Sequence, residues 1–441
     1  MSTFLFTTLP SNDLGLLTRS LPIARELRDL GHEVLFCSPG AAPRRLVEDA
    51  GFEGRVPDEP LYSLSDEATM LRLLCRGRWH EIRVMMRLWR QMRRSATAEV
   101  WTVDHFFALL GTGDVDFARA AVASLIRLIR DCRADAVVDF WNPLACIAAR
   151  ATGTRLVSVL QADTHPDSAG FIWWRPVPAG LPTAVTGLNQ VLAELELPSV
   201  QRTAELLLGD PTLVLGIPET DPVPGHPTLT HIGPILWEPP NAALPEWVPR
   251  SEQGQPLVWV YPGNMRYMRG SSTPFDSLVV LEACIEALSE EPVQVVLTTG
   301  HQPLPRRFRH LPANFRYAPY LPALSLAERC SLMIHHGGYG SCQTGLWAGR
   351  PQVIVPTYSE RESNARRVAA AGAGIVVLPE GNASGTKKHL RPEPLRDAVR
   401  LILSQPEYAR NAERLRGQLR RYGGARQAAR LIAQATSTVS T

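Results

Sequence analysis

The sequence predicts an α/β protein that consists of two domains, each built around a parallel sheet. The chain has 441 residues, which is too long for one typical hydrophobic core and suits two domains of ordinary size. Residues 3–37 read as strand, helix and strand, and two strands joined in this way pair in parallel. Residues 331–355 repeat this order, with a glycine-rich turn between the strand and the helix.

The N-terminal half continues this alternation of strands and helices. Thr3–Leu9 is a short apolar run, and Gly31–Cys37 reads as a helix stop that leads into a second buried strand. A later helix is expected over Val115–Arg130. Further strands are expected at 134–139, 156–160 and 212–215. The half ends near Trp237, because the proline-rich segment that follows is typical of a connector. The predicted division is an N-terminal domain over 1–237, a linker over 238–250, a C-terminal domain over 251–405 and a helix with a tail over 406–441.

Composition argues against several classes of protein. The 46 Lys and Arg side chains face 43 Asp and Glu, a net charge of +3, whereas a generic nucleic-acid-binding protein usually has a stronger basic excess. The seven cysteines are scattered without CxxC spacing, which indicates a reducing compartment and no structural zinc. No basic and apolar leader precedes the first strand, and no apolar run approaches ~18 residues. We therefore expect a cytoplasmic protein with no nucleic-acid partner.

The most informative stretch is the glycine-rich turn His335-His-Gly-Gly-Tyr-Gly-Ser341. A turn of this kind from a strand into a helix, expected over Cys342–Ala348, presents bare backbone N–H groups at a positive helix end, which suits a diphosphate. Glycine lets the backbone approach the anion closely, and His336 and Ser341 offer further donors. The next strand, Pro351–Val355, is followed by Glu360 and Arg361, at the edge where ligands of open α/β sheets bind.

The order of these residues resembles the donor-binding signature of one enzyme family. His336-Gly-Gly-Tyr-Gly-Ser341, Gly349-Arg-Pro-Gln352, Pro356, the pair Glu360-Arg361 and Asn364 fall at its spacing. The family is the GT-B glycosyltransferases of family 1, the UDP-glycosyltransferase-like group that acts on natural products. The resemblance implies two Rossmann-like domains that face each other across an interdomain cleft. The first would bind the acceptor and the second the nucleotide-sugar donor, with a C-terminal helix over about 406–434 partly returning to the first domain.

The resemblance implies a donor site with several departures from the family pattern. Thr344 stands where many relatives have a glutamate that holds the ribose, and Tyr320 replaces the tryptophan of the base pocket. Arg361 replaces the glutamine that grips sugar hydroxyls, so either its planar cationic fork contacts the donor or it pairs with Glu362. The implied donor-binding residues are Gly263, Asn264, Tyr320, Leu321, His336, Gly338, Tyr339, Gly340, Ser341, Thr344, Glu360 and Arg361.

The catalytic dyad of the family is broken. Relatives that glycosylate hydroxyls carry a histidine after the first strand as general base, but here Leu14 or Leu16 takes its place, with Asp13 nearby. The partner aspartate is present as Asp139. The base is then Asp139 or Asp13, with Asp139 favoured because it matches without a gap, or it comes from the loop 161–167. Alternatively, the chain has lost transfer activity.

On the acceptor side, the expected contacts lie in loops that follow the strands of the first domain. Phe171–Trp174 reads as a lid or a lining for an apolar acceptor. Segment 72–94 carries eight arginines against the single acid Glu81, so it is either a domain helix with a solvated basic face or a contact for an anionic membrane, acceptor or partner. The implied acceptor-binding residues are Asn12, Trp141, Asn142, Asp163, His165 and Trp173.

The function that this sequence predicts is inverting transfer of a sugar from a nucleoside-diphosphate sugar to a small aromatic or polyketide-like acceptor. No DxD metal motif lies in the segments expected to line the cleft, so we expect neither a metal nor a cofactor beyond the nucleotide-sugar co-substrate. Two alternatives stay open: a catalytically silent homologue that acts as an auxiliary protein, and another GT-B enzyme such as a sugar-nucleotide epimerase. The sequence leaves the sugar, the acceptor, the linkage and the oligomeric state open.

Overall fold

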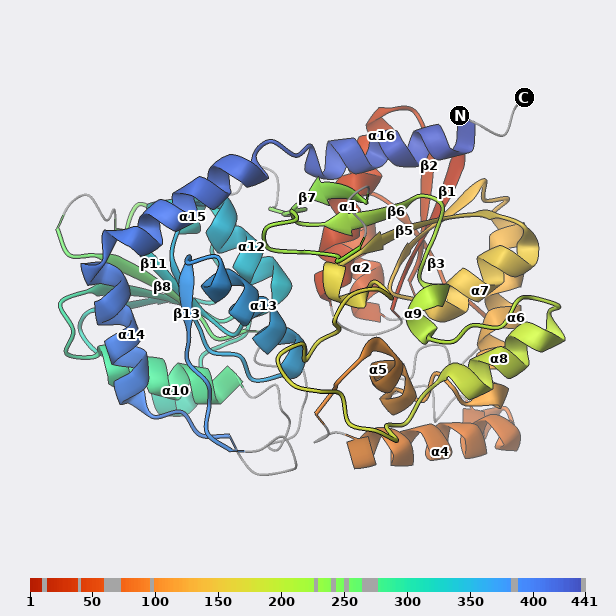
Figure 1. Ribbon diagram of the computed structural model, residues 1–441, viewed down its shortest axis with the longest axis horizontal. Coiled ribbons are helices and arrows are strands. Elements are labelled where there is room, and N and C mark those ends of the chain that lie inside the picture. The colour runs from red at the N-terminus through yellow and green to blue at the C-terminus, as the bar shows by residue number, and fades with distance from the viewer. Residues whose placement is uncertain are drawn as a thin grey trace.

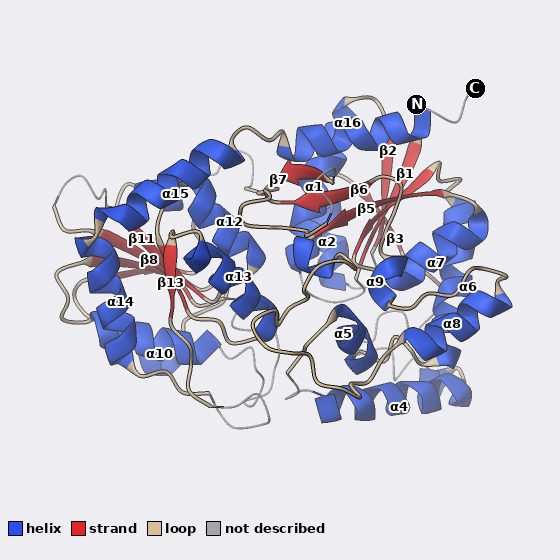
Figure 2. Cartoon of the chain, in the orientation of Figure 1, coloured by secondary structure: helices blue, strands red, loops and turns tan. Residues whose placement is uncertain are grey.

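The computed structural model describes residues 1–9, 14–38, 41–58, 73–95, 99–225, 229–238, 243–249, 254–263, 277–381 and 388–437. Within these residues, two parallel sheets form the centres of two α/β units, and helices cover both faces of each sheet (Figures 1 and 2). The first sheet ends at Gly233 and the second begins at Leu257, so the expected linker lies between them.

The first sheet has seven parallel strands in the order β3-β2-β1-β4-β5-β6-β7. Their bounds are β1 Thr3–Thr8, β2 Glu33–Cys37, β3 Glu53–Arg55, β4 Ala136–Phe140, β5 Arg155–Leu160, β6 Thr212–Leu215 and β7 Thr230–Gly233. The central strands are apolar along their whole length because both faces are covered. In β1, Phe4 and Phe6 pack on one face and Leu5 packs on the other, as the alternation of a strand requires.

Two sets of helices cover this sheet. One face carries α1, α2 and the C-terminal helix α16, and the other carries α4 to α8 with the short α9. The bounds are α1 Leu14–Asp29, α2 Ala41–Asp49, α4 Trp79–Ser95, α5 Val103–Leu109, α6 Val115–Asp131, α7 Pro143–Thr152, α8 Val185–Glu194 and α9 Thr203–Leu206. The expected helix over Val115–Arg130 is confirmed as α6, with Asp114 as its N-cap.

The second sheet has six parallel strands in the order β10-β9-β8-β11-β12-β13. Its strands are β8 Leu257–Tyr261, β9 Gln294–Thr298, β10 Phe315–Ala318, β11 Leu332–His335, β12 Gln352–Ile354 and β13 Gly374–Val376. The helices around it are α10 Ser277–Leu288, α11 Ala323–Arg329, α12 Tyr339–Trp347, α13 Ser359–Ala370 and α14 Pro392–Ser404. Helix α12 begins at Tyr339 rather than at the expected Cys342, because Gly338 already serves as its N-cap.

The C-terminal segment is two helices, so the expected single helix over 406–434 is wrong. Helix α15 (Pro406–Leu419) packs on α12 in the second domain, and α16 (Gly424–Ser437) packs on α1 in the first. The chain turns between them at Gly424, whose φ of +52° favours glycine. The predicted return to the first domain is therefore made by α16, which Figure 1 shows beside α1 and β1.

The two domains interlock through single side chains. Tyr339 of α12 packs into the apolar cluster of the first domain, and Ile217, which follows β6, packs into a cluster of the second. Apolar side chains therefore contribute to the contact between the two domains, and one of them, Tyr339, belongs to the glycine-rich turn. None of the helices among the described residues is both long and apolar enough to cross a membrane.

Candidate active site

The glycine-rich turn packs closely against the ring of His336 and against the N-terminal part of α13. Gly337 has a φ of +84°, and a Cβ on it would lie 2.7 Å from the carbonyl oxygen of Arg361. A Cβ on Gly338 would lie 2.5 Å from Nε2 of His336. A side chain at either position would clash with these atoms and change the conformation of the turn. The glycines therefore allow the backbone N–H groups at the N-terminus of α12 to lie at the carboxyl end of the sheet.

A buried pair holds this turn in place. Nδ1 of His335 accepts a hydrogen bond from the backbone N–H of Gly337 at 3.1 Å, so Nε2 carries the proton and donates to Oε1 of Gln352 at 2.7 Å. The amide nitrogen of Gln352 donates in turn to the carbonyl of Cys342 at 3.2 Å. Burial lowers the pKa of His335 to about 4, which keeps the ring neutral. His335 and Gln352 therefore fix the turn and leave ligand binding to their neighbours.

His336 is the histidine that faces the open end of the turn. Its ring lies edge-on to Tyr261, with 5.4 Å between the centroids. A Cβ on Gly263 would come within 3.0 Å of the ring, so the turn after β8 also closes on it. Burial and the nearby Arg361 hold the pKa of His336 well below its usual value. Its Nδ1 atom is buried and has no hydrogen-bond partner among the residues that the structure describes.

The expected sugar clamp lies at the N-terminus of α13, immediately after β12. Oε1 of Glu360 accepts from Nδ2 of Asn364 at 2.9 Å, and the same amide donates to the carbonyl of Gly337 at 3.2 Å. Gln161 of the first domain also donates to Oε1 of Glu360, at 3.3 Å. Asn364 thus ties the clamp to the turn, and Gln161 ties it to the other domain.

Arg361 and Thr344, which replace the usual residues of the family pattern, both form hydrogen bonds within the second domain. Arg361 donates to the hydroxyl of Thr357 at 3.0 Å, whereas Glu362, the alternative partner, pairs with Arg366 at 2.7 Å. The hydroxyl of Thr344 donates to the carbonyl of Gly340 at 2.8 Å inside α12. Thr344 is thus used within its own helix.

The expected base pocket keeps an aromatic platform. Tyr320 stacks on His301, with centroids 4.1 Å apart and an interplanar angle of 13°. Leu321 is buried in the core beside β8, and Ser341 is half-buried in the first turn of α12. Asn264 lies outside the described residues.

Asp139, the favoured candidate for the general base, already uses both carboxylate oxygens within the first domain. Asp139 lies inside β4 and is fully buried. One carboxylate oxygen accepts from the hydroxyl of Thr7 at 2.5 Å and the other accepts from the backbone N–H of Asn142 at 3.0 Å. Burial raises the pKa of Asp139 to about 6. Asn142, an expected acceptor contact, is fully buried as the N-cap of α7, so both residues hold the turn between β4 and α7. Asp13 and Asn12 lie outside the described residues.

Asp163 stands out on the acceptor side. It lies in a short 3-10 helix, η1 (Ala162–Thr164), directly after β5, and its side chain is only 1% exposed. Both carboxylate oxygens lack a hydrogen-bond partner among the described residues. Burial raises its pKa to about 7, while Arg367 and Arg19 lower it and Glu360 and Asp221 raise it further. The sequence marked Asp163 as an acceptor contact and its loop, 161–167, as one possible source of the general base, but nothing local shows that this carboxylate has no partner.

Aromatic side chains gather beside this loop. Trp141 follows β4 with a φ of +71°, which is unusual for a bulky residue and often marks a functional site. Its ring lies 5.0 Å from Phe106 and 6.0 Å from Phe171 between centroids, and its indole N–H is buried with no partner among the described residues. Trp174 lies under the guanidinium of Arg366 from α13, 4.3 Å from its ring centre. This segment therefore reaches the donor domain.

The other two expected acceptor contacts differ in exposure. Trp173 is 39% exposed, and Phe171 and Ile172 beside it are buried in the core. The lid interpretation therefore applies to the two tryptophans and not to the whole segment. His165 is buried, and its Nδ1 accepts from the backbone N–H of Asp167 at 3.2 Å. That contact lies within its own loop.

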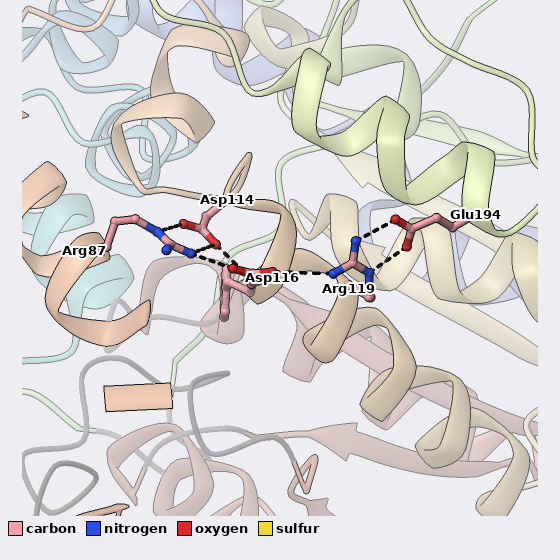
Figure 3. A network of polar contacts seen from close by, with 6 residues as sticks. Arg87, Asp114, Asp116, Arg119 and Glu194 are labelled. Carbon is pink, nitrogen blue, oxygen red and sulfur yellow. Dashed lines mark hydrogen bonds and ion pairs between the residues drawn. The ribbon is translucent and has the colours of Figure 1, made fainter. Parts of the chain in front are cut away.

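The arginine-rich segment forms α4, whose apolar side packs on the first domain. Figure 3 shows how Arg87 is neutralised: it pairs with Asp114 and Asp116, and Arg119 links Asp116 to Glu194 of α8. This network favours the domain-helix interpretation for Arg87. Arg83 and Arg90 are exposed, together with Trp79, Met86 and Trp89. Membrane contact through this face stays a prediction.

Comparison with known proteins points to one group of enzymes. Residues 282–421 match the family model "Erythromycin biosynthesis protein CIII-like, C-terminal domain". The 4'-demethylrebeccamycin synthase of Lentzea aerocolonigenes is 31% identical over 193 residues, which cover 44% of this chain and 41% of that protein. A PGL/p-HBAD biosynthesis rhamnosyltransferase of Mycobacterium bovis is 26% identical over 355 residues, 78% of this chain and 69% of that protein. The matches to the rebeccamycin enzyme and to a mycobacterial PGL/p-HBAD glycosyltransferase span only 41% and 44% of those proteins.

Solved structures resemble the whole chain. The calicheamicin glycosyltransferase CalG4 superposes with a TM-score of 0.71 at 18% identity, covering 100% of both chains. The glycosyltransferase VinC in complex with dTDP gives 0.66 at 19% identity, covering 99% of this chain and 100% of VinC. The rhamnosyltransferase SpnG with spinosyn aglycone gives 0.66 at 20% identity, covering 98% and 100%. At such identities the likeness shows the fold, and the two-domain architecture predicted from the sequence is confirmed.

Proposed function

We propose that this chain, which has the GT-B fold and an EryCIII-like C-terminal domain, is a glycosyltransferase that moves a sugar from a nucleoside-diphosphate sugar to a small natural product. The observation that carries the proposal is the turn between β11 and α12. It presents backbone N–H groups at a helix N-terminus beside the unpartnered Nδ1 of a neutral histidine, His336. Such a group of donors suits a diphosphate.

The chemistry proposed for this turn is departure of the nucleoside diphosphate in an inverting, metal-independent displacement. The helix N-terminus, the backbone donors and a proton on His336 would stabilise charge that develops on the leaving oxygen. Because the pair His335–Gln352 holds the turn rigidly, these donors need little rearrangement when the bond breaks. Glu360 and Arg361 would hold the sugar beside the turn. The nucleotide-sugar is then a co-substrate, and no other cofactor is required.

The acceptor proposed for the first domain is aromatic or polyketide-like. Trp141 and Phe106 are partly exposed rings that pack on each other, with Trp141 resting on the buried Phe171, and Trp174 reaches Arg366 of the donor domain. Flat apolar molecules pack well against such rings. Among the structural neighbours, SpnG holds spinosyn aglycone and VinC holds dTDP, which supports a natural-product acceptor and makes a thymidine nucleotide a good first donor to test.

A silent auxiliary protein is the second candidate, and one observation favours it. The expected catalytic partner Asp139 is fully buried, and both of its oxygens already accept hydrogen bonds. Turnover of any donor with any acceptor would exclude this candidate. A sugar-nucleotide epimerase or hydrolase is the third, and product analysis with the donor alone separates it from a transferase.

A thermal-shift screen over dTDP, UDP, GDP and their sugars tests the proposal. A ligand that binds only the native state at 100-fold its Kd stabilises the fold by about 2.7 kcal/mol, so a nucleotide that fits raises the melting temperature. The matched control is the nucleoside alone, which lacks the diphosphate. If no diphosphate shifts the melting temperature beyond its nucleoside, the turn does not bind a donor and the proposal is wrong.

A further inference from the structure

The acidic side chains near the domain interface differ in whether their carboxylate oxygens accept hydrogen bonds. Asp221 accepts from Thr220 at 2.7 Å and from Gln343 at 3.3 Å, and Glu360 accepts from Asn364 and Gln161. The carboxylate of Asp163 accepts nothing from the described residues, although it is as deeply buried as that of Asp221. A buried carboxylate without a partner is costly, so it persists only where something else requires it.

The position of Asp163 fits the space between acceptor and donor. Its loop belongs to the first domain, yet Gln161, two residues earlier, hydrogen-bonds Glu360 of the sugar clamp. The same segment continues to Phe171, whose ring contacts that of Trp141. Asp163 therefore lies on the first-domain side of the sugar clamp, near enough to Glu360 for the charge of that residue to raise its pKa.

The charged and titratable groups around Asp163 come from four parts of the chain. Arg19 belongs to α1, Asp221 follows β6, and Glu360 and Arg367 lie on α13, with Tyr339 of α12 under Arg19 at 5.3 Å. The two cations lower the pKa of Asp163 and the two other acids raise it, and burial is the largest influence. The pKa of Asp163 is accordingly raised to about 7, close to the value at which a general base is most effective at neutral pH.

From this geometry we propose that Asp163 is the general base that replaces the absent histidine, a role that rests on the proposed sugar transfer. The acceptor O–H bond breaks as its proton moves to the Asp163 carboxylate. The acceptor oxygen forms the new bond to the anomeric carbon, and the bond from that carbon to the diphosphate breaks, its electron pair leaving with the diphosphate. The proton passes to solvent when the products depart.

The test uses the full chain, dTDP-glucose and two phenols of different acidity, para-nitrophenol and para-methoxyphenol. Asp163→Asn should lower turnover of para-methoxyphenol by ~10²–10⁴-fold and that of para-nitrophenol far less, because the more acidic phenol is already largely ionised and needs no base. The fall in wild-type turnover below about pH 7 should disappear in the variant. Added formate should restore part of the turnover of Asp163→Ala, since it can fill the position of the lost carboxylate.

The matched control is Asp210→Asn in the segment before β6, whose side chain is 93% exposed and should not affect turnover. Affinity for dTDP, measured by calorimetry, reports whether each variant is folded. If Asp163→Asn binds dTDP normally and loses turnover equally with both phenols, or loses none, Asp163 is not the base although the enzyme is a transferase. If the wild-type protein binds dTDP and glycosylates neither phenol, the proposed function fails, and this inference fails with it.

Discussion

The turn after β11 and the loop after β5 approach the same region from opposite domains, and they differ in how their buried polar groups are satisfied. In the donor turn, His335, Gln352 and Asn364 form a connected set of hydrogen bonds, and Nδ1 of His336 is left without a partner among the described residues. In the acceptor loop, Asp163 is buried with both oxygens unpartnered among the described residues. A network of polar groups with all hydrogen bonds formed makes a site rigid. A buried polar group without a partner lowers the stability of the fold, and such groups are found where a reaction needs them. The comparison indicates a preformed donor side and a reactive group on the acceptor side.

The largest effect is expected at the donor turn. His336→Ala should weaken binding of a nucleoside diphosphate by about 1.5–3 kcal/mol, the usual contribution of a hydrogen bond to a charged group. Calorimetry with dTDP measures this, and His310→Ala, an exposed histidine of the same domain, is the matched control. Unchanged affinity in His336→Ala would remove this residue from the donor site.

The next two predictions contrast the two buried aspartates. Asp139→Asn should destabilise the fold at pH 8 by up to about 1 kcal/mol, because the single amide oxygen of asparagine accepts only one of the Thr7 and Asn142 hydrogen bonds. The loss is held down because the variant also removes a buried charge whose pKa is raised to about 6. Turnover per folded molecule should stay near that of the wild type. Urea unfolding and an activity assay measure the two quantities separately. A hundredfold loss of turnover with normal stability would return Asp139 to catalysis.

Asp163→Asn should change the free energy of unfolding in the opposite direction to Asp139→Asn. It should stabilise the fold above pH 7 by on the order of 1–3 kcal/mol. The folded pKa of Asp163 is raised to about 7 from 3.8, so in the wild type the cost of ionising it is absent below pH 3.8 and grows as pH rises through 7. The gain in the variant should shrink as pH falls from 7 toward 4. Urea unfolding at pH 8 and pH 5 measures it, and a destabilised variant at pH 8 would show that Asp163 is paired.

A smaller effect is expected at Arg361. Arg361→Gln restores the residue that the family uses at the sugar, so it should change preference among dTDP-sugars by roughly tenfold or less, about 1.4 kcal/mol, and leave dTDP affinity intact. Competition between two dTDP-sugars measures this preference, with Arg410→Gln on the exposed side of α15 as the control. Equal losses with every donor would make Arg361 a structural residue.

The smallest effect concerns α4. If its exposed face binds anionic lipid, Arg83→Gln should weaken association with phosphatidylserine vesicles by about 1 kcal/mol, the usual contribution of one basic side chain near such a surface. Vesicle flotation measures the bound fraction, with phosphatidylcholine vesicles as the control surface and Arg414→Gln on α15 as the control variant. Equal flotation of the wild type on both lipids would exclude electrostatic membrane contact.

The fold and the donor turn can be predicted from local sequence. Binding a diphosphate with backbone N–H groups depends on glycines and a helix start within one strand–turn–helix unit, so the evidence is local and residues 335–364 contain it. The alternation of strands and helices is local in the same sense. The break at Gly424 was missed because the apolar periodicity continues on both sides of it, and only the packing of α15 and α16 on different domains separates them.

The roles of the acceptor-side carboxylates depend on contacts between distant segments of the chain. Asp139 matched the family by position, but its burial depends on Thr7, 132 residues away in the chain. Asp163 was one polar residue in a loop until β5, β6 and α13 placed Glu360, Asp221 and Arg367 around it. Whether a carboxylate is paired, and therefore how readily it takes a proton, depends on burial and on the charges that surround it. Those are set by segments far apart in the chain, and no local pattern of residues records them.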